Sequence, residues 1–359
     1  MMGESLKKIL MMAGGTGGHI FPAIAIAKKL QEYGAEIHWL GTRHGLEATL
    51  IPELKLPIHY ISVTGIRGKG ILALFLFPLQ MLIACSQTLY LFLKIKPHCV
   101  LGMGGFVSGP GGLIAWLLRK PLMIHEQNAV MGLTNKMLSK LAEKVLLAAV
   151  VGNPVREEIV AIEAPSERFA GRSGPLRLLV LGGSLGALAL NQLVLETLAG
   201  LSEKDRPDVW HQSGALHDDA LVSAYREKNI LAKIEPFIED MAVAYAWADC
   251  VVCRAGAMTI SELMAAGVAS ILVPFPFSVD DHQTHNTEQL VQAGAAICIQ
   301  QRDLSPAVLM QLLADFSQDR PRLLKMAQAA RDLNKNRGHA AEKIARICLE
   351  CSGQNTALF

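Results

Sequence analysis

Residues 9–30, ILMMAGGTGGHIFPAIAIAKKL, decide how this chain folds. The apolar run at 9–13 is bounded by glycine, which is typical of a strand buried on both faces of a parallel sheet. Beyond the glycines, apolar residues recur at helical spacing at Ile20, Ala23, Ile24, Ala27 and Leu30. Pro22 suits the first turn of such a helix, where its missing N–H is not needed. We therefore expect a strand, a glycine loop and a helix in succession.

The glycine loop, GGTGGH at residues 14–19, has the properties of an anion site. Free backbone N–H groups and the positive end of a helix dipole meet between a strand end and a helix start. His19 adds the one common side chain that titrates near neutral pH. Ile20 stands where the dinucleotide pattern needs its third glycine, and no G-K-[ST] follows to make a P-loop. A turn that only packs the helix on the sheet remains the alternative.

Length and composition limit the class of protein. The chain has 359 residues, of which 51% are hydrophobic and 18% charged, so we expect two domains with a large core. A net charge of +2 argues against nucleic acid as the main partner. The sequence MMGESLKK leads into the first strand without a secretory signal, and seven cysteines are an odd number. Both features favour a reducing cytoplasm.

Two groups of residues raise the question of a metal. The Cys250/Cys253 and Cys348/Cys351 pairs have C-x-x-C spacing, but residues three apart on a strand face opposite ways. A second group, Asp280, Asp281, His282 and His285, matches no zinc-helix motif, and sugar hydroxyls bind the same side chains. We therefore expect no metal and no cofactor, with a metal at either group as the alternative.

A second glycine loop, GMGGFVSGP at residues 102–110, follows the strand expected at 99–103. Two such loops at strand ends of one parallel sheet can face the same crevice. Gly14 and Gly15 of the first loop and Gly104 and Gly105 of the second would together suit a pyrophosphate. His125, Glu126 and Asn128 follow at the carboxyl end of the strand expected at 122–126, where binding groups collect.

The stretch at 71–95 carries no charge before Lys94 and is long enough to span a bilayer. Polar residues and Pro78 interrupt it, and strand-like segments lie on both sides. We therefore predict a crossover helix whose first part, 71–77, is partly exposed. Arg67 and Lys69 flank that part, as suits a membrane surface. The predicted membrane patch is Ile71, Leu72, Leu74 and Phe75; a wholly buried helix is the alternative.

The second half of the chain repeats the pattern after a turn at 152–156. A strand at 177–181, a third glycine loop at 182–187 and a helix at 188–198 predict a second domain of the same kind. At 254–267, Gly256 makes a turn, Thr259 or Ser261 caps a helix, and Glu262 in its first turn pairs with the dipole or with ribose hydroxyls. The sequence thus predicts two α/β domains with parallel sheets, facing across a cleft.

The ordered set GGTGGH, GMGGFVSGP, HEQNAVMGLTNK, GNPVR, GGSLGA, RAGAMTISE and DDHQTHN resembles the MurG family. These are membrane-associated N-acetylglucosaminyltransferases of bacterial peptidoglycan synthesis, on which cell shape and division depend. The resemblance implies a GT-B fold of two Rossmann-like domains. Residues 1–153, completed by a C-terminal helix at 338–359, would bind acceptor and membrane, and residues 154–337 would bind the UDP-sugar.

The resemblance also implies an activity and its partners. N-acetylglucosamine would pass from its UDP donor to the 4-hydroxyl of undecaprenyl-pyrophosphoryl-N-acetylmuramoyl-pentapeptide (lipid I), with inversion, to give lipid II. The enzyme would be peripheral on the cytoplasmic side of the inner membrane, beside other cell-wall synthesis proteins.

Site residues carry over by motif. His19 is the candidate general base, and the two glycine loops would cradle the acceptor pyrophosphate. The residues expected to contact the donor are Thr16, Gly17, Gly18 and Asn128 for the sugar, Arg156 and Ser184 for the diphosphate, Ile238 for uracil, Ala257, Met258, Thr259, Ile260, Ser261 and Glu262 for the nucleoside, and Gln283 for the sugar hydroxyls.

The chain departs from the family pattern in two places. Leu185 stands where the family commonly has glutamine, and the segment between Val145 and Gly152 is shorter than usual. Two rival functions also fit parts of the sequence: a UDP-N-acetylglucosamine 2-epimerase, and a non-catalytic module that binds a lipid pyrophosphate. An epimerase has no use for an apolar surface, and a binding module has no use for His19.

Overall fold

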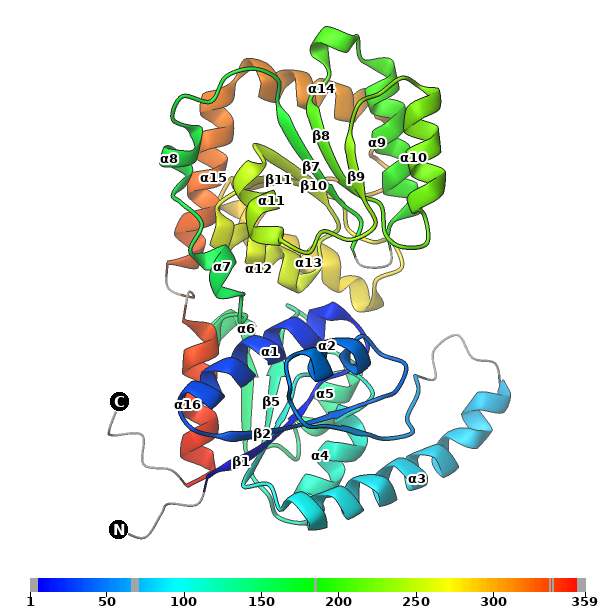
Figure 1. The fold of residues 1–359 in the computed structure, drawn as a ribbon, viewed down its shortest axis with the longest axis vertical. Coiled ribbons are helices and arrows are strands. Elements are labelled where there is room, and N and C mark those ends of the chain that lie inside the picture. Colours follow the sequence, from blue (N-terminus) through cyan, green and yellow to red (C-terminus); the bar gives the residue numbers. More distant parts are fainter. Residues whose placement is uncertain (1–5, 66–70, 184–185, 336, 338, 354–359) are drawn as a thin grey trace. The chain divides into compact units, whose positions relative to one another are not determined.

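The computed structural model describes residues 6–65, 71–183, 186–335, 337 and 339–353, without the side chains of 71–74 and 279. The chain divides into two compact units (Figure 1). Unit 1 comprises Met1–Arg156 and His339–Phe359, and unit 2 comprises Glu157–Gly338.

Unit 1 is built on a six-stranded parallel sheet with the order β3-β2-β1-β4-β5-β6. Its strands are β1 Lys8–Met12, β2 Glu36–Gly41, β3 Ile58–Tyr60, β4 Cys99–Gly102, β5 Leu122–Glu126 and β6 Lys144–Leu147. Ile9 of the central strand β1 is paired with Ile37 on one side and Cys99 on the other. The strand order reverses between β1 and β4, and in such sheets ligands bind beyond the carboxyl ends of the strands at this point.

Alternate residues of β1 serve two separate cores, as the two-residue period of a strand requires. Ile9 and Met11 pack with helix α1 (Gly17–Glu32) and with α16 (Ala340–Cys351), which returns to unit 1 from the far end of the chain (Figure 1). Leu10 and Met12 pack with α3 (Ile71–Ile95) and α4 (Ser108–Leu117) on the opposite face. The short helices of this unit are α2 Glu47–Glu53, α5 Leu133–Leu138 and α6 Ala148–Val151.

Two local predictions for unit 1 are wrong. Pro22 lies inside α1 rather than in its first turn, because the helix already begins at Gly17. The apolar run at 144–151 predicts one strand over its whole length, but β6 ends at Leu147 and Ala148–Val151 forms the helix α6. The apolar composition of this segment fits either structure, so the pattern alone did not distinguish them.

Unit 2 contains a second six-stranded parallel sheet, of order β12-β11-β10-β7-β8-β9. Its strands are β7 Arg177–Leu181, β8 Asp208–Gln212, β9 Lys233–Glu235, β10 Cys250–Cys253, β11 Ala269–Leu272 and β12 Ala296–Cys298. Counted from the first strand of each unit, both sheets have the Rossmann order 3-2-1-4-5-6. The predicted pair of Rossmann-like sheets is confirmed, although β12 was not predicted.

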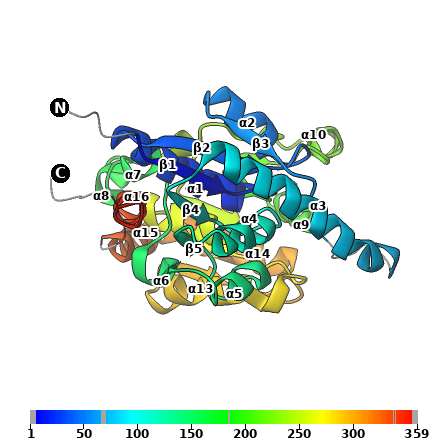
Figure 2. The same ribbon diagram turned by 90° about the horizontal axis from the view of Figure 1, so that it is seen from below.

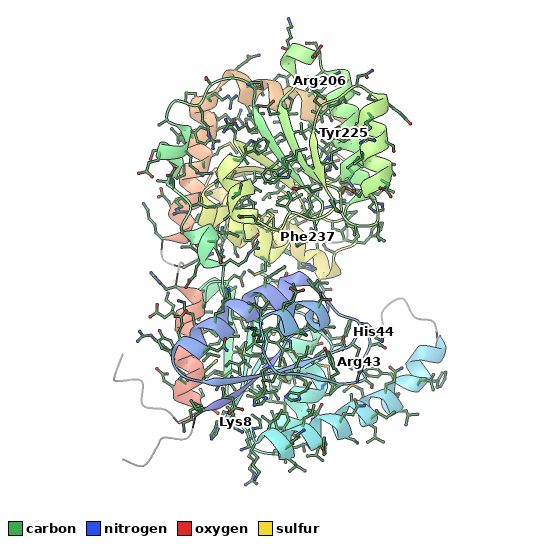
Figure 3. All side chains as sticks on the ribbon, viewed as in Figure 1. Lys8, Arg43, His44, Arg206, Tyr225 and Phe237 are labelled. Carbon is green, nitrogen blue, oxygen red and sulfur yellow. The ribbon has the colours of Figure 1, made fainter. Side chains whose placement is uncertain are left out.

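The larger helices of unit 2 are α9 Leu188–Gly200, α10 Asp218–Glu227, α11 Met241–Trp247, α12 Ala257–Ala266, α13 His282–Gln292, α14 Pro306–Gln318 and α15 Arg320–Asn334, with short helices α7 Glu157–Val160 and α8 Pro165–Phe169. Tyr225 of α10 is buried beside β8 (Figure 3), and its hydroxyl lies 2.8 Å from Nδ1 of His211. Burial lowers the pKa of His211 to about 3, so this histidine is neutral at physiological pH.

Helix α3 connects β3 to β4 of one parallel sheet, which confirms the predicted crossover helix. The stripe Ala84, Thr88, Phe92 and Ile95 is buried, but the other faces of the helix carry exposed apolar side chains. The prediction of partial exposure is therefore confirmed at Phe75, which is 78% exposed, and the wholly buried alternative is wrong. Over Phe75–Ile95 the helix is long and apolar enough to cross a membrane by length and composition. Its first turns extend beyond the rest of unit 1 (Figure 2).

Candidate active site

The two glycine loops of unit 1 are in direct contact at the point where the strand order reverses. Loop 1 (residues 14–18) follows β1, and loop 2 (residues 103–107) follows β4. A Cβ atom on Gly105 would lie 2.7 Å from the carbonyl oxygen of Gly14, which is closer than any side chain permits. Gly105 also has a positive φ of 79°. Only glycine allows this approach, so the sequence of loop 2 holds the two loops together.

His19 lies in the first turn of α1, and its ring packs against loop 2. A Cβ on Gly104 would lie 3.0 Å from both Cδ2 and Nε2 of the imidazole. Nδ1 of His19 is buried and accepts or donates no hydrogen bond within the described part of the chain. Burial lowers the pKa of His19 below its ordinary value of 6.5, while the carboxylate of Glu126 acts in the opposite direction. The ring is therefore a neutral base at physiological pH, held against loop 2.

Glu126, at the carboxyl end of β5, organises the polar side of this site. Its Oε1 accepts hydrogen bonds from the backbone N and Nδ2 of Asn128, both at 3.0 Å. Its Oε2 accepts hydrogen bonds from the Gly132 N–H and from Nδ2 of Asn135, at 3.1 and 2.9 Å. Asn128, predicted to contact the donor sugar, is thus bonded to Glu126 in this structure.

Two further amides beside this site were missed from the sequence. Gln127 donates from Nε2 to the Met103 carbonyl of loop 2, and Asn135 donates to the His125 carbonyl. Their oxygens, Gln127 Oε1 and Asn135 Oδ1, are buried and accept no hydrogen bond within the described residues. Buried acceptors of this kind are normally satisfied, so these two oxygens are exceptions at the carboxyl end of the sheet. The strand end at Glu126 is the sequence signal that points to them.

Loop 1 does not present all of its N–H groups to a ligand. Gly15 N donates to Oε2 of Glu47 at 3.0 Å, which corrects the expectation of a free donor at this glycine. The Thr16 carbonyl accepts from the N–H groups of His19 and Ile20 at 3.1 and 3.4 Å, and Thr16 is the N-cap of α1. Gly17 and Gly18 are the first two residues of α1, and such residues lack the usual helical acceptor.

Arg156 lies in unit 1, as the last residue of its first segment. Its guanidinium carbon lies 5.2 Å from the centre of the Phe21 ring of α1, within cation–π range. The Arg156 side chain, which we predict to bind the diphosphate, therefore packs on α1, the helix that carries His19.

In unit 2, one buried amide joins two segments that the sequence assigned to the nucleotide. Gln212, at the end of β8, donates from Nε2 to the Gly183 carbonyl at 3.1 Å and accepts from the Ile238 N–H at 3.1 Å. Gly183 belongs to the third glycine loop, loop 3 (residues 182–187), whose Ser184 and Leu185 lie outside the described residues. The Ile238 N–H predicted for uracil thus has an internal acceptor in this structure.

Helix α12 starts beside the point where the strand order of unit 2 reverses. It begins at Ala257 with Gly256 as N-cap, so the predicted caps Thr259 and Ser261 are wrong, and Glu262 lies beyond the first turn. The Ser261 hydroxyl instead donates to the Ala257 carbonyl within the helix. Glu262 is buried and accepts a hydrogen bond from the Tyr245 hydroxyl at 3.1 Å. The residues predicted to line the nucleoside, Ala257, Met258, Thr259, Ile260, Ser261 and Glu262, therefore form the first six positions of α12.

Gln283, in the first turn of α13, is tied to the same end of the sheet. Its Oε1 accepts from Ala255 N at 3.2 Å and from Phe275 N at 2.9 Å. Two consecutive residues just before it, Asp280 and Asp281, have left-handed backbone conformations with φ near 50°. No group of three or more His, Cys, Asp or Glu residues within the described ranges is placed to hold a metal ion.

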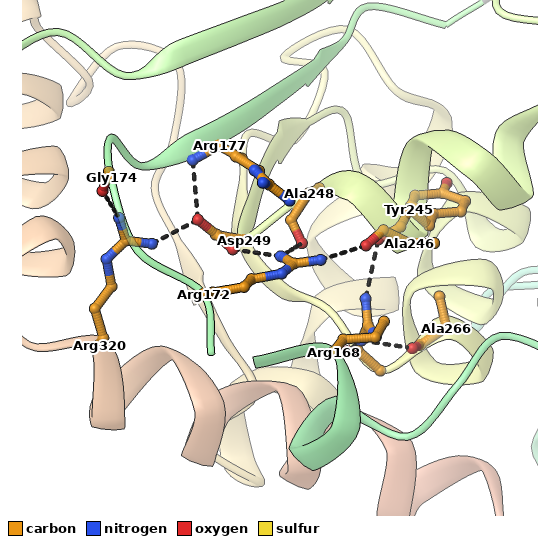
Figure 4. Close-up of polar contacts among 11 residues, drawn as sticks. Arg168, Arg172, Gly174, Arg177, Tyr245, Ala246, Ala248, Asp249, Ala266 and Arg320 are labelled. Carbon is orange, nitrogen blue, oxygen red and sulfur yellow. Dashed lines mark hydrogen bonds and ion pairs between the residues drawn. The ribbon is translucent and has the colours of Figure 1, made fainter. Parts of the chain in front are cut away.

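Arginines stabilise the opposite end of α12. Arg168 donates to the carbonyls of Tyr245, Ala266 and Gly267, at the carboxyl ends of α11 and α12 (Figure 4). Asp249, which directly precedes β10, forms ion pairs with both Arg172 and Arg320. Cations at helix carboxyl ends offset the exposed carbonyls there. This network fixes α12, whose amino end faces the candidate nucleotide site.

Comparison with known sequences identifies both halves of the chain. Residues 9–147 match the glycosyltransferase family 28 N-terminal domain, and residues 177–344 match the glycosyltransferase family 28 C-terminal domain. A protein of Marinobacter nauticus, 51% identical over 96% of this chain and 98% of its own length, is named UDP-N-acetylglucosamine--N-acetylmuramyl-(pentapeptide) pyrophosphoryl-undecaprenol N-acetylglucosamine transferase. A protein of Nitrosococcus oceani with the same name is 50% identical over 96% of this chain and 98% of its own length.

Solved structures agree with these sequence matches. The crystal structure of Acinetobacter baumannii MurG is 39% identical, covers 96% of this chain and 99% of its own, and superposes with a TM-score of 0.79. The calicheamicin glycosyltransferase CalG4, at 14% identity and a TM-score of 0.68 over 98% of this chain and 99% of its own, shares the fold alone. The predicted GT-B fold is confirmed, and the chain belongs to glycosyltransferase family 28, among the MurG-type N-acetylglucosaminyltransferases.

Proposed function

We propose that the chain transfers N-acetylglucosamine from UDP-N-acetylglucosamine to the 4-hydroxyl of lipid I, which gives lipid II for peptidoglycan synthesis. The single observation that carries this proposal is the position of His19. A neutral histidine lies half-buried against Gly104 of loop 2, and Nδ2 of Asn135 lies 3.5 Å from the same Gly104 Cβ position. This arrangement occurs in a chain about half identical, over nearly its full length, to curated transferases of this name.

The chemistry needs one proton acceptor and one stabilised leaving group. His19 takes the proton of the acceptor 4-hydroxyl as its oxygen attacks the anomeric carbon of the donor sugar. The bond from that carbon to the UDP oxygen breaks, UDP leaves with the electron pair, and the α-linked sugar becomes β-linked. A histidine whose pKa lies below 6.5 is already deprotonated near pH 7, which suits it to this role.

We assign recognition of UDP to unit 2. Ile238 would pair its backbone with uracil, Glu262 would accept from the ribose hydroxyls, and Ser184 with the amino end of α9 would face the diphosphate. Helix amino termini stabilise the negative charge that develops on UDP. Gln283 would bind the sugar hydroxyls. Thr16, Gly17, Gly18, Asn128 and Arg156 would complete the donor contacts from unit 1.

We assign the acceptor to loops 1 and 2, at the carboxyl ends of β1 and β4. The pyrophosphate of lipid I would lie where loops 1 and 2 meet, beside Gly15, which is exposed and has no atom within 4 Å of its Cβ position. The muramoyl group would lie near Gln127 and Asn135, whose amides border loop 2.

We assign membrane contact to the exposed apolar face of α3. Its large exposed side chains are Phe75, Leu76, Leu79, Leu82, Ile83, Leu89, Tyr90 and Leu93. Lys94 lies at the end of the helix, and cations beside apolar side chains favour an anionic lipid surface. Ile71, Leu72 and Leu74 of the predicted patch belong to the same helix, and their side chains, like residues Arg67 and Lys69, lie outside the described part. The enzyme would thus be peripheral on the cytoplasmic side of the inner membrane, where its lipid substrate and other cell-wall proteins are found.

An assay with radiolabelled UDP-N-acetylglucosamine tests the activity. The purified chain, given a polyprenyl-pyrophosphoryl-N-acetylmuramoyl-pentapeptide, should form a labelled lipid product, with and without a chelator. Turnover of the UDP-sugar without any lipid acceptor would indicate an epimerase instead. Binding of the lipid pyrophosphate without any turnover would indicate a non-catalytic module.

A further inference from the structure

The carboxylate of Glu47 lies directly beneath loop 1. Glu47 is the first residue of α2, and its side chain is fully buried at 0% exposure. Its Oε2 accepts from Gly15 N at 3.0 Å, and its Oε1 accepts from the backbone N and the hydroxyl of Thr42 at 2.8 and 2.9 Å. Three hydrogen-bond donors therefore hold this buried carboxylate in place.

Three glycines leave the space that this carboxylate occupies. A Cβ on Gly14 would lie 2.8 Å from Oε1 of Glu47, and a Cβ on Gly41 would lie 2.7 Å from its Cγ. A Cβ on Gly45 would overlap the carboxylate itself. Backbone from three segments, at Gly14, Gly41 and Gly45, therefore packs directly against the Glu47 side chain.

A continuous series of contacts runs from Glu47 to the catalytic histidine. Gly14 is held between Glu47 on one side and Val107 of loop 2 on the other, both at 2.8 Å from its Cβ position. The Gly14 carbonyl in turn packs against Gly105, and the neighbouring Gly104 packs against His19. Gly15, bonded to Glu47, has a φ of 97° and sets the path of the chain into α1.

We propose that Glu47 is a positioning residue that fixes loop 1 against loop 2 and thereby holds His19 in its place beside Gly104. This inference rests on the proposed function, because it assigns Glu47 a role in the step that His19 performs. It also explains why loop 1 has a carboxylate at Gly15, where an anion site alone would leave the N–H free. Donor recognition by unit 2 does not depend on Glu47.

The variant Glu47→Gln keeps the shape of the side chain and removes one acceptor oxygen. Its NH2 group must face the backbone N–H of either Gly15 or Thr42, and both are donors, so the side chain no longer ties loop 1 to Thr42. We expect kcat for lipid II formation to fall about 10- to 100-fold, since small misplacements of a catalytic group cost that much. The dissociation constant of UDP should stay within about twofold of wild type, which also shows that the variant is folded.

The pH profile separates positioning from a merely structural role. If loop 1 moves, His19 leaves the buried position against Gly104, and the acidic limb of kcat shifts to higher pH, toward the ordinary value for histidine. Glu53→Gln, an exposed carboxylate on the same helix, is the matched control and should keep the wild-type rate and profile. A Glu47→Gln enzyme with wild-type kcat and an unshifted limb would overturn the inference.

Glu47→Asp keeps the charge but shortens the reach, and it covers the case in which Glu47→Gln fails to fold. Glu47→Asp should bind UDP with wild-type affinity and have a lower kcat than the wild type. A wild-type kcat in this variant would contradict a positioning role for Glu47. The proposed function fails separately, if wild-type enzyme makes no lipid product at all. An active wild-type enzyme beside a fully active Glu47 variant leaves the function intact and removes only this inference.

Discussion

The imidazole of His19 rests on Gly104, a residue 85 positions further along the chain in the other glycine loop of unit 1. A Cβ at Gly104 would come within 3.0 Å of the ring, and φ at this glycine is 94°. The contact joins the two loops at the point where the sheet order reverses, and it gives the candidate base a defined position.

The first prediction concerns this contact. Gly104→Ala should lower kcat at least about tenfold, because the added methyl group displaces His19 by part of an ångström or more. Steady-state kinetics with saturating UDP-N-acetylglucosamine and lipid I measure it. Gly34→Ala is the control, since Gly34 also has a positive φ but no atom within 4 Å of its Cβ position. An equal decrease in kcat in Gly104→Ala and Gly34→Ala would show that backbone strain, and not the contact with His19, causes the effect.

The second prediction concerns pH. His19 acts in its neutral form, and burial places its pKa below 6.5, so the rate should fall as pH decreases through a value below 6.5 and stay level above it. A pH profile of kcat/KM measures this limb. A limb centred above pH 6.5, or one that persists unchanged in the residual activity of His19→Gln, would contradict the assignment.

The third prediction concerns the donor side. Gln212→Met removes both hydrogen bonds that join Gly183 of loop 3 to Ile238. The dissociation constant of UDP should rise about tenfold, because Gly183 and Ile238 lose the amide that preorganises both segments for the nucleotide. Calorimetric titration with UDP checks this. Gln311→Met, on the exposed side of α14, should bind UDP as wild type does. Unchanged affinity in Gln212→Met would show that the bridge is not needed.

The fourth prediction concerns the membrane. The double variant Phe75→Asp, Leu82→Asp should weaken binding to phosphatidylglycerol vesicles at least about tenfold, because two charges replace two exposed apolar side chains on α3. Sedimentation with vesicles measures the bound fraction. Leu231→Asp places one charge on a leucine of unit 2 that is 93% exposed, more than Phe75 or Leu82, and should change nothing. Equal vesicle binding by all three proteins would exclude α3 as the contact surface.

The fold was predictable because its strands are short apolar runs closed by glycine or polar residues. β5 (Leu122–Glu126) and β7 (Arg177–Leu181) have the predicted bounds, as has α3. Periodicity failed where composition fits two structures: the segment after Leu147 turns into α6, and the short edge strand β12 was missed. The caps predicted at Thr259 and Ser261 failed because Gly256 already starts α12.

The motifs located His19 and the glycine loops but not the side chains that hold them. Glu47 bonds Gly15 across 32 residues, and Gln212 bonds Ile238 across 26. A carboxylate at the start of a short helix or an amide at a strand end resembles a solvent-facing residue in the sequence. Only the folded chain brings such groups to their partners, so no local pattern indicates them.

The most direct measurement compares wild-type enzyme with His19→Ala in the formation of labelled lipid II from UDP-N-acetylglucosamine and lipid I. The wild type should turn over, and His19→Ala should bind UDP with wild-type affinity while its kcat falls at least about 100-fold, the usual contribution of a general base. A His19→Ala enzyme that makes lipid II at the wild-type rate would contradict the account.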